Sequence, residues 1–391
     1  MLPGIPQSKD LMNAYGTIVA RNYLPHARLL ARSFREHHPD DVFVCLVTDG
    51  GRDQGWGDDG LNADPGLRVV TPAELPVDAE LFSAMAFMYD VMELATALKP
   101  FLLQMLLAEV GGGATATYLD PDMYVYAPVP ALTSNDAVAL LTPHRLSPAP
   151  LDTQIPQESL FLRHGAFNLG FVSVNGAATQ LLEWWGQRLT VDAVIAPREA
   201  LFTDQKWMDL APTYFAVEQL RQAGVNVAWW NIDERQLRHE ADRITVNGDP
   251  LRLAHFSGYR AGRDPFQPRT QPGPHWQESR AIFEELAQDY LRGLAEETAA
   301  GQGRGDEGPG YTFATYADGR AITSYERRRF RRDMRASFVS GQPLPAAPWY
   351  ESSSLREEAR RRAFAAVDST VGQALPWDLI AARLKRRKIR A

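Results

Sequence analysis

The 391-residue sequence contains a single cysteine, Cys45, and this scarcity excludes two kinds of site. One cysteine cannot form an internal disulfide or a cysteine-built metal site, and it is typical of a reducing compartment such as the cytoplasm. Because Cys45 lies inside the apolar run of residues 42–47, we interpret it as a small buried side chain rather than a catalytic thiol.

Long uncharged apolar segments are also missing from the sequence. No window of about 18 residues is apolar and free of charge throughout, which argues against a membrane-spanning helix. The first residues, MLPGIPQSKDLMNAYG, lack the basic region and apolar run of a secretory signal. These absences predict a cytoplasmic protein.

Basic side chains are scarce in the first 300 positions, which contain 23 Lys and Arg against 38 Asp and Glu, a net charge of −15. Such an acidic body argues against nucleic acid as a substrate. Residues 301–391 have the opposite balance, with 18 basic and 10 acidic side chains and a net charge of +8. This basic end favours an anionic surface or an anionic partner.

What the sequence does contain is an alternation of strand-like and helix-like patterns. In the first half it predicts strands at 16–20, 41–48, 67–71 and 114–119, and helices at 24–37 and 89–110, the second interrupted by Pro100. Further on it predicts strands at 137–142, 167–175, 225–232 and 251–256, and helices at 177–189, 203–210 and 325–338. The alternation is typical of a mostly parallel sheet covered by helices.

Length and composition predict three parts. A single core usually stops growing at about 250–300 residues, so we expect one large catalytic domain, residues 1–300, followed by an appendage. Residues 301–310, GQGRGDEGPG, have the composition of a flexible linker. Residues 311–391 are expected to form a basic, mostly helical C-terminal extension.

The clearest chemical motif is Asp120-Pro121-Asp122, which follows an apolar strand. On extended backbone the two carboxylates point the same way, and Pro121 tends to end strand pairing. The carboxyl end of a strand in an α/β sheet is the usual ligand-binding edge. Two such acids need a cation, and oxygen ligands suit Mg²⁺ or Mn²⁺. The alternative is a solvated turn with Asx capping.

Four motifs follow one another in order: YLDPDMYVY at 118–126, FNLGFVSVN at 167–175, FTDQKWMDL at 202–210 and LAHFSG at 253–258. With them, the segment of residues 14–260 resembles the retaining glycosyltransferases of family 8 and their bacterial relatives. The resemblance implies the GT-A fold, an α/β, Rossmann-like, mixed and mostly parallel sheet flanked by helices. It also implies hexose transfer, with retention, from a nucleotide-sugar, expected to be a UDP-sugar.

The resemblance implies a metal site made by Asp120, Asp122 and His255. The two acids match the family's metal-binding D-x-D, and Asp120 is also expected to contact the donor. His255 matches the histidine that completes the site, and Gly258 follows it as in the family's H-x-x-G. Carboxylates with a neutral imidazole suit Mn²⁺, so Mn²⁺ or Mg²⁺ is the expected cofactor. The alternative is that His255 is a core residue.

The expected catalytic residues are Asn168, Asp204 and Gln205. Asn168 matches the asparagine of the family's F-N-x-G, and its amide suits sugar hydroxyls. Gly170 would let the sugar approach the backbone closely. Asp204 and Gln205 match the pair beside the reacting sugar, where they would stabilise an oxocarbenium-like state. The alternatives are a strand-turn cap for Asn168 and a helix N-cap for Asp204.

Donor-binding residues are expected on the first strand, at Thr17, Ala20, Asn22 and Tyr23. Tyr23 would stack on the base and Asn22 would bond to it. Lys99 lies where the family has a basic residue near the ribose and phosphates; the alternative is a solvated helix residue. These assignments, too, are what the resemblance implies.

The sequence departs from the family where a lysine, proline and tryptophan usually hold the diphosphate. Here it reads HFSGYRAGRDP, so Arg260 or Arg263 is expected to supply the charge, and Gly258 and Arg260 are assigned to the donor site. The pairs 184–185 and 229–230 are tryptophans, which suit a sugar-stacking platform or the core.

The final segment, PWDLIAARLKRRKIRA, is a basic amphipathic pattern with Trp377, Ile380 and Leu384 on one helical face. Such a segment can lie on anionic lipid, which gives the hypothesis of membrane association near a lipid-linked acceptor. The alternative is a helix docked on the protein itself. The acceptor class stays open between a glycan, a lipid-linked glycan and a small molecule.

Two other functions compete with transfer. A sugar-phosphate nucleotidyltransferase needs a glycine-rich loop after the first strand, whereas this sequence has ARNYLPHA. A non-catalytic nucleotide-sugar or glycan-binding protein would bind the donor without turnover. Inverting transfer would require a general base, for which the sequence offers no unambiguous candidate.

Overall fold

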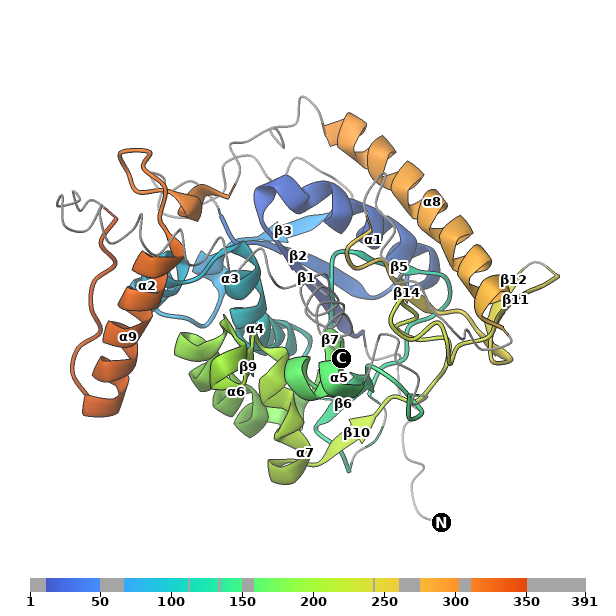
Figure 1. The fold of residues 1–391 in the computed structure, drawn as a ribbon, viewed down its shortest axis with the longest axis horizontal. Helices are drawn as coiled ribbons and strands as arrows, with labels where there is room; N and C mark the ends of the chain where they lie inside the picture. The colour runs from blue at the N-terminus through green and yellow to red at the C-terminus, as the bar shows by residue number, and fades with distance from the viewer. Residues whose placement is uncertain are drawn as a thin grey trace, which may run out of the picture. The chain divides into compact units, whose positions relative to one another are not determined.

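The computed structural model describes residues 12–49, 67–111, 113–132, 134, 136–149, 158–241, 243–259, 275–301 and 311–349. The chain divides into two compact units (Figure 1). The first unit comprises residues 1–79 and 91–312, and the second comprises residues 80–90 and 313–391. The predicted linker, residues 301–310, lies outside the described residues except at its first position, and the predicted division at that linker stays a prediction.

The strands are β1 (Ala14–Val19), β2 (Val42–Val47), β3 (Arg68–Val70), β4 (Thr115–Leu119), β5 (Met123–Val125), β6 (Ala139–Pro143), β7 (Phe167–Asn175), β8 (Ile195–Ala196), β9 (Leu201–Phe202), β10 (Val217–Gln219), β11 (Leu237–Glu240), β12 (Arg243–Val246), β13 (Asp249–Pro250) and β14 (Leu253–His255). The helices are α1 (Leu24–His37), α2 (Ala79–Met88), α3 (Val91–Ala97), α4 (Lys99–Val110), α5 (Glu158–His164), α6 (Thr179–Asp192), α7 (Ala211–Tyr214), α8 (Trp276–Gly301) and α9 (Ser324–Ser340).

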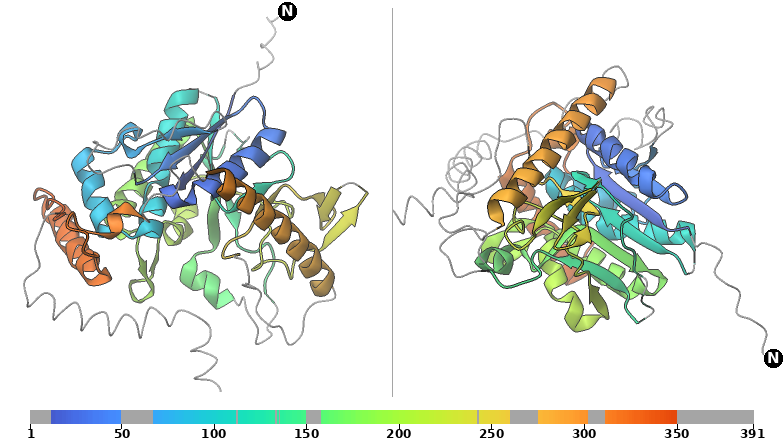
Figure 2. Two further views of the ribbon diagram at one scale, coloured as in Figure 1. Left: turned by 90° about the horizontal axis from the view of Figure 1, so that it is seen from above. Right: turned by 90° about the vertical axis from the view of Figure 1, so that its right-hand side faces the viewer.

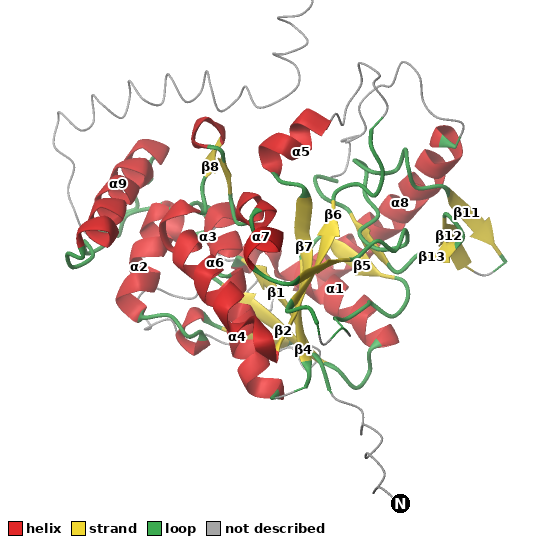
Figure 3. Cartoon of the chain, turned by 90° about the horizontal axis from the view of Figure 1, so that it is seen from below, coloured by secondary structure: helices red, strands yellow, loops and turns green. Residues whose placement is uncertain are grey.

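Within the described residues, the main sheet has seven strands in the order β10-β6-β7-β4-β1-β2-β3. All neighbours pair in parallel except β7, which is antiparallel to both β4 and β6. The predicted fold class, a mixed and mostly parallel sheet flanked by helices, is therefore confirmed (Figure 3). The carboxyl ends of its parallel strands meet at one edge, which is where such sheets bind ligands.

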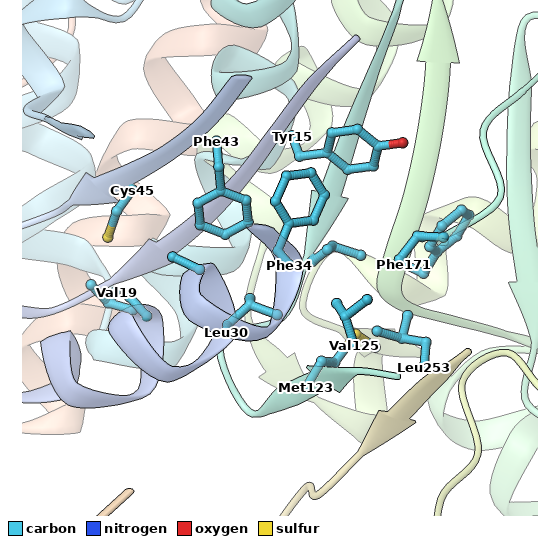
Figure 4. Packing of buried hydrophobic residues seen from close by; sticks show 14 of the residues in the cluster. Tyr15, Val19, Leu30, Phe34, Phe43, Cys45, Met123, Val125, Phe171 and Leu253 are labelled. Carbon is cyan, nitrogen blue, oxygen red and sulfur yellow. The ribbon is translucent and has the colours of Figure 1, made fainter. Parts of the chain in front are cut away.

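Alternation along β1 brings a helix to each face of the sheet. The ring of Tyr15 packs on Phe34 of α1, with 4.5 Å between ring centroids (Figure 4). On the other face, a Cβ on Gly16 would lie 3.0 Å from Leu106 of α4, so this position has no room for a side chain. Buried on both faces, β1 and β2 are apolar runs, and Cys45 is a buried residue of β2, as expected.

The break predicted at Pro100 separates α3 from α4, and it falls at Leu98. A proline cannot donate to the preceding turn, so it lies in the first turn of the new helix. Residues 91–110 are long and apolar enough to cross a membrane by length and composition alone, with a mean hydropathy of 1.4. Here α4 packs against β1 and β4, which accounts for its apolar character as that of a core helix.

Two predicted elements differ from the structure. Residues 225–232 do not form a strand; they form turns with one isolated bridge between Val227 and Ala254. Asn226 in this segment has a φ of 55°, which is incompatible with extended backbone. Residues 205–209 form a 3₁₀ turn in place of the predicted helix. The sequence analysis also did not anticipate α8, which packs along α1 (Figure 2).

The second unit combines two segments that are far apart in the sequence, α2 and residues from 313 onward. Arg327 of α9 is buried and donates to the carbonyl oxygens of Phe87, at 2.7 Å, and Phe313, at 2.6 Å. The ring of Phe87 also contacts the rings of Phe330 and Trp349 at 5.1 Å each. The predicted amphipathic segment, residues 376–391, lies outside the described residues.

Candidate active site

The two acids of the D-x-D motif lie at the carboxyl edge of the main sheet, between β4 and β5. The backbone N–H of Asp120 donates to the carbonyl of Gly170 on β7 at 2.8 Å, which holds it at the sheet. The carbonyl of Asp122 accepts from the N–H of Phe256 at 2.8 Å. Because β14 runs antiparallel to β5, His255 lies opposite Met123 and next to both acids. Pairing of two short strands thus assembles the trio.

We call Asp120, Asp122 and His255 the metal corner. The Nε2 atom of His255 lies 3.0 Å from Oδ1 of Asp122 and 3.7 Å from Oδ2 of Asp120. One ligand atom from each residue can be chosen so that all lie within 4.8 Å of one another. This oxygen and nitrogen set fits a divalent cation of the Mn²⁺ type. The two acids are partly exposed, so a ligand can reach them.

The electrostatics of the metal corner follow from burial and charge. Burial alone would lower the pKa of His255, but the carboxylates of Asp122 and Asp120 outweigh it and raise that pKa. Burial alone would raise the pKa of Asp122, but His255 outweighs it and lowers that pKa. His255 and Asp122 therefore each favour the charged form of the other.

A second cluster, which we call the lysine corner, consists of Lys99 and Asp204. The ammonium group of Lys99 lies 3.0 Å from Oδ2 of Asp204 and 3.4 Å from Oδ1 of Asp120, and it donates to the carbonyl of Leu169 at 2.9 Å. It also lies 4.4 Å above the ring of Tyr118. An ammonium has three N–H donors, so three protein oxygens can occupy all of them.

The lysine corner is buried more deeply than the metal corner, since Lys99 is 3% and Asp204 is 2% exposed. Burial lowers the pKa of Lys99, but Asp120 and Asp204 outweigh it and raise that pKa. The pKa of Asp204 is raised, mainly by burial, while Lys99 opposes the rise. The expected contact of Lys99 with ribose and phosphates stays a prediction, because its nitrogen is directed at protein oxygens.

The other two expected catalytic residues are joined to the same strand, β7. The Oδ1 atom of Asn168 accepts from the N–H of Gly170 at 3.1 Å. Gln205 accepts from the N–H of Leu169 at 3.3 Å and donates to the carbonyl of His164 at 2.9 Å. A Cβ on Gly170 would lie 2.7 Å from the ring of His255, so glycine is needed there for packing.

These residues surround one cavity of about 590 Å³. The expected site residues that line it are Ala20, Asn22, Tyr23, Lys99, Asp120, Asp122, Asn168, Asp204, Gln205 and His255. Its volume and its concave, partly apolar wall are those of a site for a small molecule. The structure therefore brings together residues that the sequence separates by more than two hundred positions.

Two expected residues, Thr17 and Gly258, are not part of this wall. Thr17 is fully buried in β1, opposite Cys45 of β2, and does not line the cavity. Gly258 has a φ of 76°, which favours glycine, but it does not line the cavity, whereas its neighbour Ser257 does. Arg260 lies outside the described residues, as does Arg263.

Aromatic side chains form another part of the wall. Trp229 and Trp230 line the cavity, whereas Trp185 is buried and donates to the carbonyl of Asp204 at 3.3 Å. Trp230 packs edge-on against His255, with 5.2 Å between ring centroids. Of the two tryptophan pairs, only the later one is placed to contact a ligand.

The sequence analysis missed Tyr118 and His144, which line the cavity, and two buried asparagines outside its wall, Asn226 and Asn231. Tyr118 donates to Oδ1 of Asp120 at 2.8 Å, and it belongs to a motif already recognised. The amide nitrogen of Asn231 donates to the carbonyls of Asn226, at 3.0 Å, and His144, at 3.3 Å. His144, Asn226 and Asn231 stand in no motif, so only their positions in space reveal them.

In sequence, the chain is similar to uncharacterized proteins. No family model matches the sequence. It is 28% identical over 260 residues to the uncharacterized protein YfnF of Bacillus subtilis (strain 168), covering 64% of this chain and 82% of that protein. It is 26% identical over 169 residues to the uncharacterized protein YfnD of the same organism, covering 41% of this chain and 52% of that protein.

Solved structures of glycosyltransferases also match. The galactosyltransferase LgtC, in complex with donor and acceptor sugar analogues, has a TM-score of 0.40 at 15% identity, over 74% of this chain and 99% of that one. The glycosyltransferase GlyE of Streptococcus pneumoniae TIGR4 has a TM-score of 0.39 at 12% identity, over 78% and 67%. A glycosyltransferase involved in glycosylation of the PBCV-1 major capsid has 0.36 at 9%, over 69% and 99%. Because these TM-scores lie below 0.5, the function has to be argued from the site residues.

Proposed function

We propose that this protein is a metal-dependent glycosyltransferase that transfers a hexose from a nucleotide-sugar, expected to be a UDP-sugar, to an acceptor, with retention. The observation that carries the proposal is the shared cavity: the metal corner, Asn168, Asp204 and Gln205 all line it. A nucleotide-sugar presents a diphosphate and a sugar side by side. The cavity presents cation ligands and polar amides side by side in the same way.

The chain's own residues would divide the work. A divalent cation, Mn²⁺ or Mg²⁺, bound by the metal corner would offset charge on the leaving diphosphate. Asp204 and the carbonyl oxygen of Gln205 would stabilise positive charge on the reacting sugar. Lys99 holds Asp204 in place by their ion pair, so the carboxylate does not need to reorganise as charge develops.

The binding regions for the base and the sugar are proposed from the family resemblance and from the residues that line the cavity around that centre. Ala20, Asn22 and Tyr23 line the cavity next to β1, and we assign the base to them. Trp229 and Trp230 offer flat apolar faces for a sugar ring. The acceptor class is a glycan, a lipid-linked glycan or a small molecule, and nucleic acid is disfavoured by the acidic body. We propose a cytoplasmic location, with membrane association through the basic C-terminus as a further hypothesis.

The proposal is tested by incubating the protein with a panel of UDP- and GDP-sugars in the presence of Mn²⁺ or of a chelator. Slow release of UDP from one sugar, dependent on the metal, is the expected result. Release that persists in chelator would overturn the metal dependence. Tight binding without turnover under any acceptor mixture would favour the alternative, a non-catalytic nucleotide-sugar or glycan-binding protein.

A further inference from the structure

One buried asparagine, Asn226, connects the metal corner to the strand that carries Asn168. It is 1% exposed, and its φ of 55° lies in the left-handed region, which asparagine tolerates better than most residues. The N–H of the next residue, Val227, donates to the carbonyl of Leu253 at 3.0 Å, and its carbonyl accepts from the N–H of His255 at 2.8 Å. The backbone therefore holds Asn226 beside His255.

The orientation of the two amides follows from a backbone group. The N–H of Gly170 donates to a side-chain atom of Asn168 at 3.1 Å, and that atom must be the oxygen, because a backbone N–H can only donate. Asn226 approaches the same oxygen at 3.1 Å, so Asn226 presents its NH₂ group there. The same NH₂ group donates to the hydroxyl of Thr142 at 3.2 Å. The carbonyl oxygen of the Asn226 amide consequently points the other way.

That oxygen determines the tautomer of His255. It lies 3.1 Å from Nδ1 of His255, and an oxygen can only accept, so Nδ1 carries a proton. With this proton on Nδ1, Nε2 is the ring nitrogen that faces Asp122, at 3.0 Å, and it can bind either a proton or a metal cation. A bound divalent cation would take the place of a proton on Nε2. The chain of hydrogen bonds therefore presents His255 as a metal ligand through Nε2.

We infer that Asn226 is a positioning residue that fixes the Nδ1-protonated tautomer of His255 and couples this ligand to Asn168. The inference rests on the proposed metal-dependent function and adds a residue that no motif contains. A hydrogen-bond partner on the second ring nitrogen fixes the orientation and basicity of a metal-bound histidine. Asn226 supplies that partner from an accepting oxygen, while its NH₂ group ties the same amide to Asn168 and Thr142.

The experiment measures the Kd of Mn²⁺ by electron paramagnetic resonance for wild-type protein and three variants. Asn226→Leu removes the accepting oxygen, and we expect about 10–100-fold weaker Mn²⁺ binding. Asn226→Asp keeps an oxygen that accepts from His255, so it should bind Mn²⁺ within a few-fold of wild type although it buries an additional carboxylate. Asn231→Ala is the matched control, because Asn231 is buried in the same segment and its amide donates to the carbonyls of Asn226 and His144 rather than to the ring of His255.

A merely structural role predicts a different order. Asn226→Asp and Asn231→Ala would then weaken Mn²⁺ binding as much as Asn226→Leu, and that result, or unchanged binding in Asn226→Leu, would overturn the inference while the metal site stands. No Mn²⁺ binding by wild-type protein would overturn the metal site itself.

Wild-type protein also gives a test that does not depend on a variant folding. Long-range ¹H–¹⁵N correlations of His255 in Mg²⁺- or Zn²⁺-loaded protein are expected to place its proton on Nδ1. A proton on Nε2 would overturn the inference.

Discussion

The metal corner and the lysine corner share one cavity and one carboxylate, Asp120, yet they balance their charges differently. In the lysine corner, the buried ammonium of Lys99 lies between two acids and neutralises them from within the chain. In the metal corner, Asp122 and Asp120 face Nε2 of His255, which can bind either a proton or a metal cation. One corner therefore carries its own permanent cation, and the other is arranged to receive one.

This difference separates two tasks that carboxylates perform in the same site. An internal cation holds Asp204 in place without any ligand and opposes the rise in its pKa that burial causes. Under the proposed function, a cation held by Asp120, Asp122 and His255 would make the metal corner sensitive to what is bound, because it would also attract the phosphates of a donor. Variants that remove charge from one corner at a time should therefore give different kinds of defect.

The largest effect is expected in the metal corner. Asp122→Asn removes one ligand charge, and transfer or donor hydrolysis should fall by ~10³-fold or more, because the charge on the leaving diphosphate is no longer offset. The assay is metal-dependent release of nucleotide from the active donor. Asp249→Asn, at an exposed position on β13 outside the cavity, is the control. Near-normal activity in Asp122→Asn would refute the metal assignment.

Removing the cation of the lysine corner should instead lower the free energy of unfolding. Lys99→Met leaves Asp204 buried without its cation, and breaking such a pair costs about 3–5 kcal/mol in the free energy of unfolding. Urea unfolding monitored by circular dichroism measures the loss. The double variant Lys99→Met with Asp204→Asn should recover part of it, because no charge is then left unpaired. If Lys99→Met unfolds like wild type in the presence and absence of Mn²⁺, the lysine corner is not the internal ion pair described above.

Another histidine that lines the cavity, His144, can be compared with His255, because it has no carboxylate partner among the described residues. Burial lowers its pKa from 6.5 to about 3, in contrast to the raised pKa of His255. Between pH 6.5 and 3, His144 binds a proton in the unfolded chain but stays neutral in the folded protein. Its contribution to stability is therefore fully present above pH 6.5 and is lost as the pH falls toward 3.

The difference is measurable by unfolding at two pH values. At one pH unit below the pKa of His144 in the unfolded chain, protonation of the unfolded state should lower the free energy of unfolding by about 1.4 kcal/mol. His144→Gln does not titrate, so it should lose less stability than wild type between pH 7 and 5.5. Equal losses would contradict a neutral, buried His144.

The smallest effect is expected at Tyr118, which touches both corners. Its hydroxyl donates to Asp120 and its ring lies under Lys99. Tyr118→Phe keeps the ring and removes the hydrogen bond, at a cost of about 1 kcal/mol or less, because the partly exposed Asp120 can bond to water instead. We expect weaker Mn²⁺ binding, measured by titration, with unfolding nearly unchanged. A larger effect on unfolding than on Mn²⁺ binding would place Tyr118 with the lysine corner alone.

Local patterns determined a large part of the fold. The sequence predicts β2 and β7 as strands because a strand that is covered on both faces is a nearly continuous apolar run. Helix α1 begins and ends as predicted, at 24 and 37, since its apolar positions recur with the helical period. The break at Pro100 follows from the missing N–H. These signals are local, so they need no knowledge of the neighbours in space.

The segment of residues 225–232 shows where local patterns fail. Its apolar side chains predict a strand, but Asn226 has a left-handed backbone, and Asn231 accepts from the N–H of Ala228 at 2.9 Å to close a turn. The apolar residues are buried against other elements instead, since Val227 and Ala228 are fully covered. Tertiary burial thus overrode the strand pattern.

The sequence by itself determined which residues carry charge and amide chemistry, and motif order predicted that Asp120, Asp122, Asn168, Asp204 and His255 act together. Only the tertiary structure decided how they are paired. Lys99 became an internal ion partner because helix α4 packs against β4, and Asn226 met His255 because one backbone bridge aligned two distant segments. Hydrogen bonds and ion pairs depend on distances of about 3 Å, and such distances are set by packing, which no local pattern encodes.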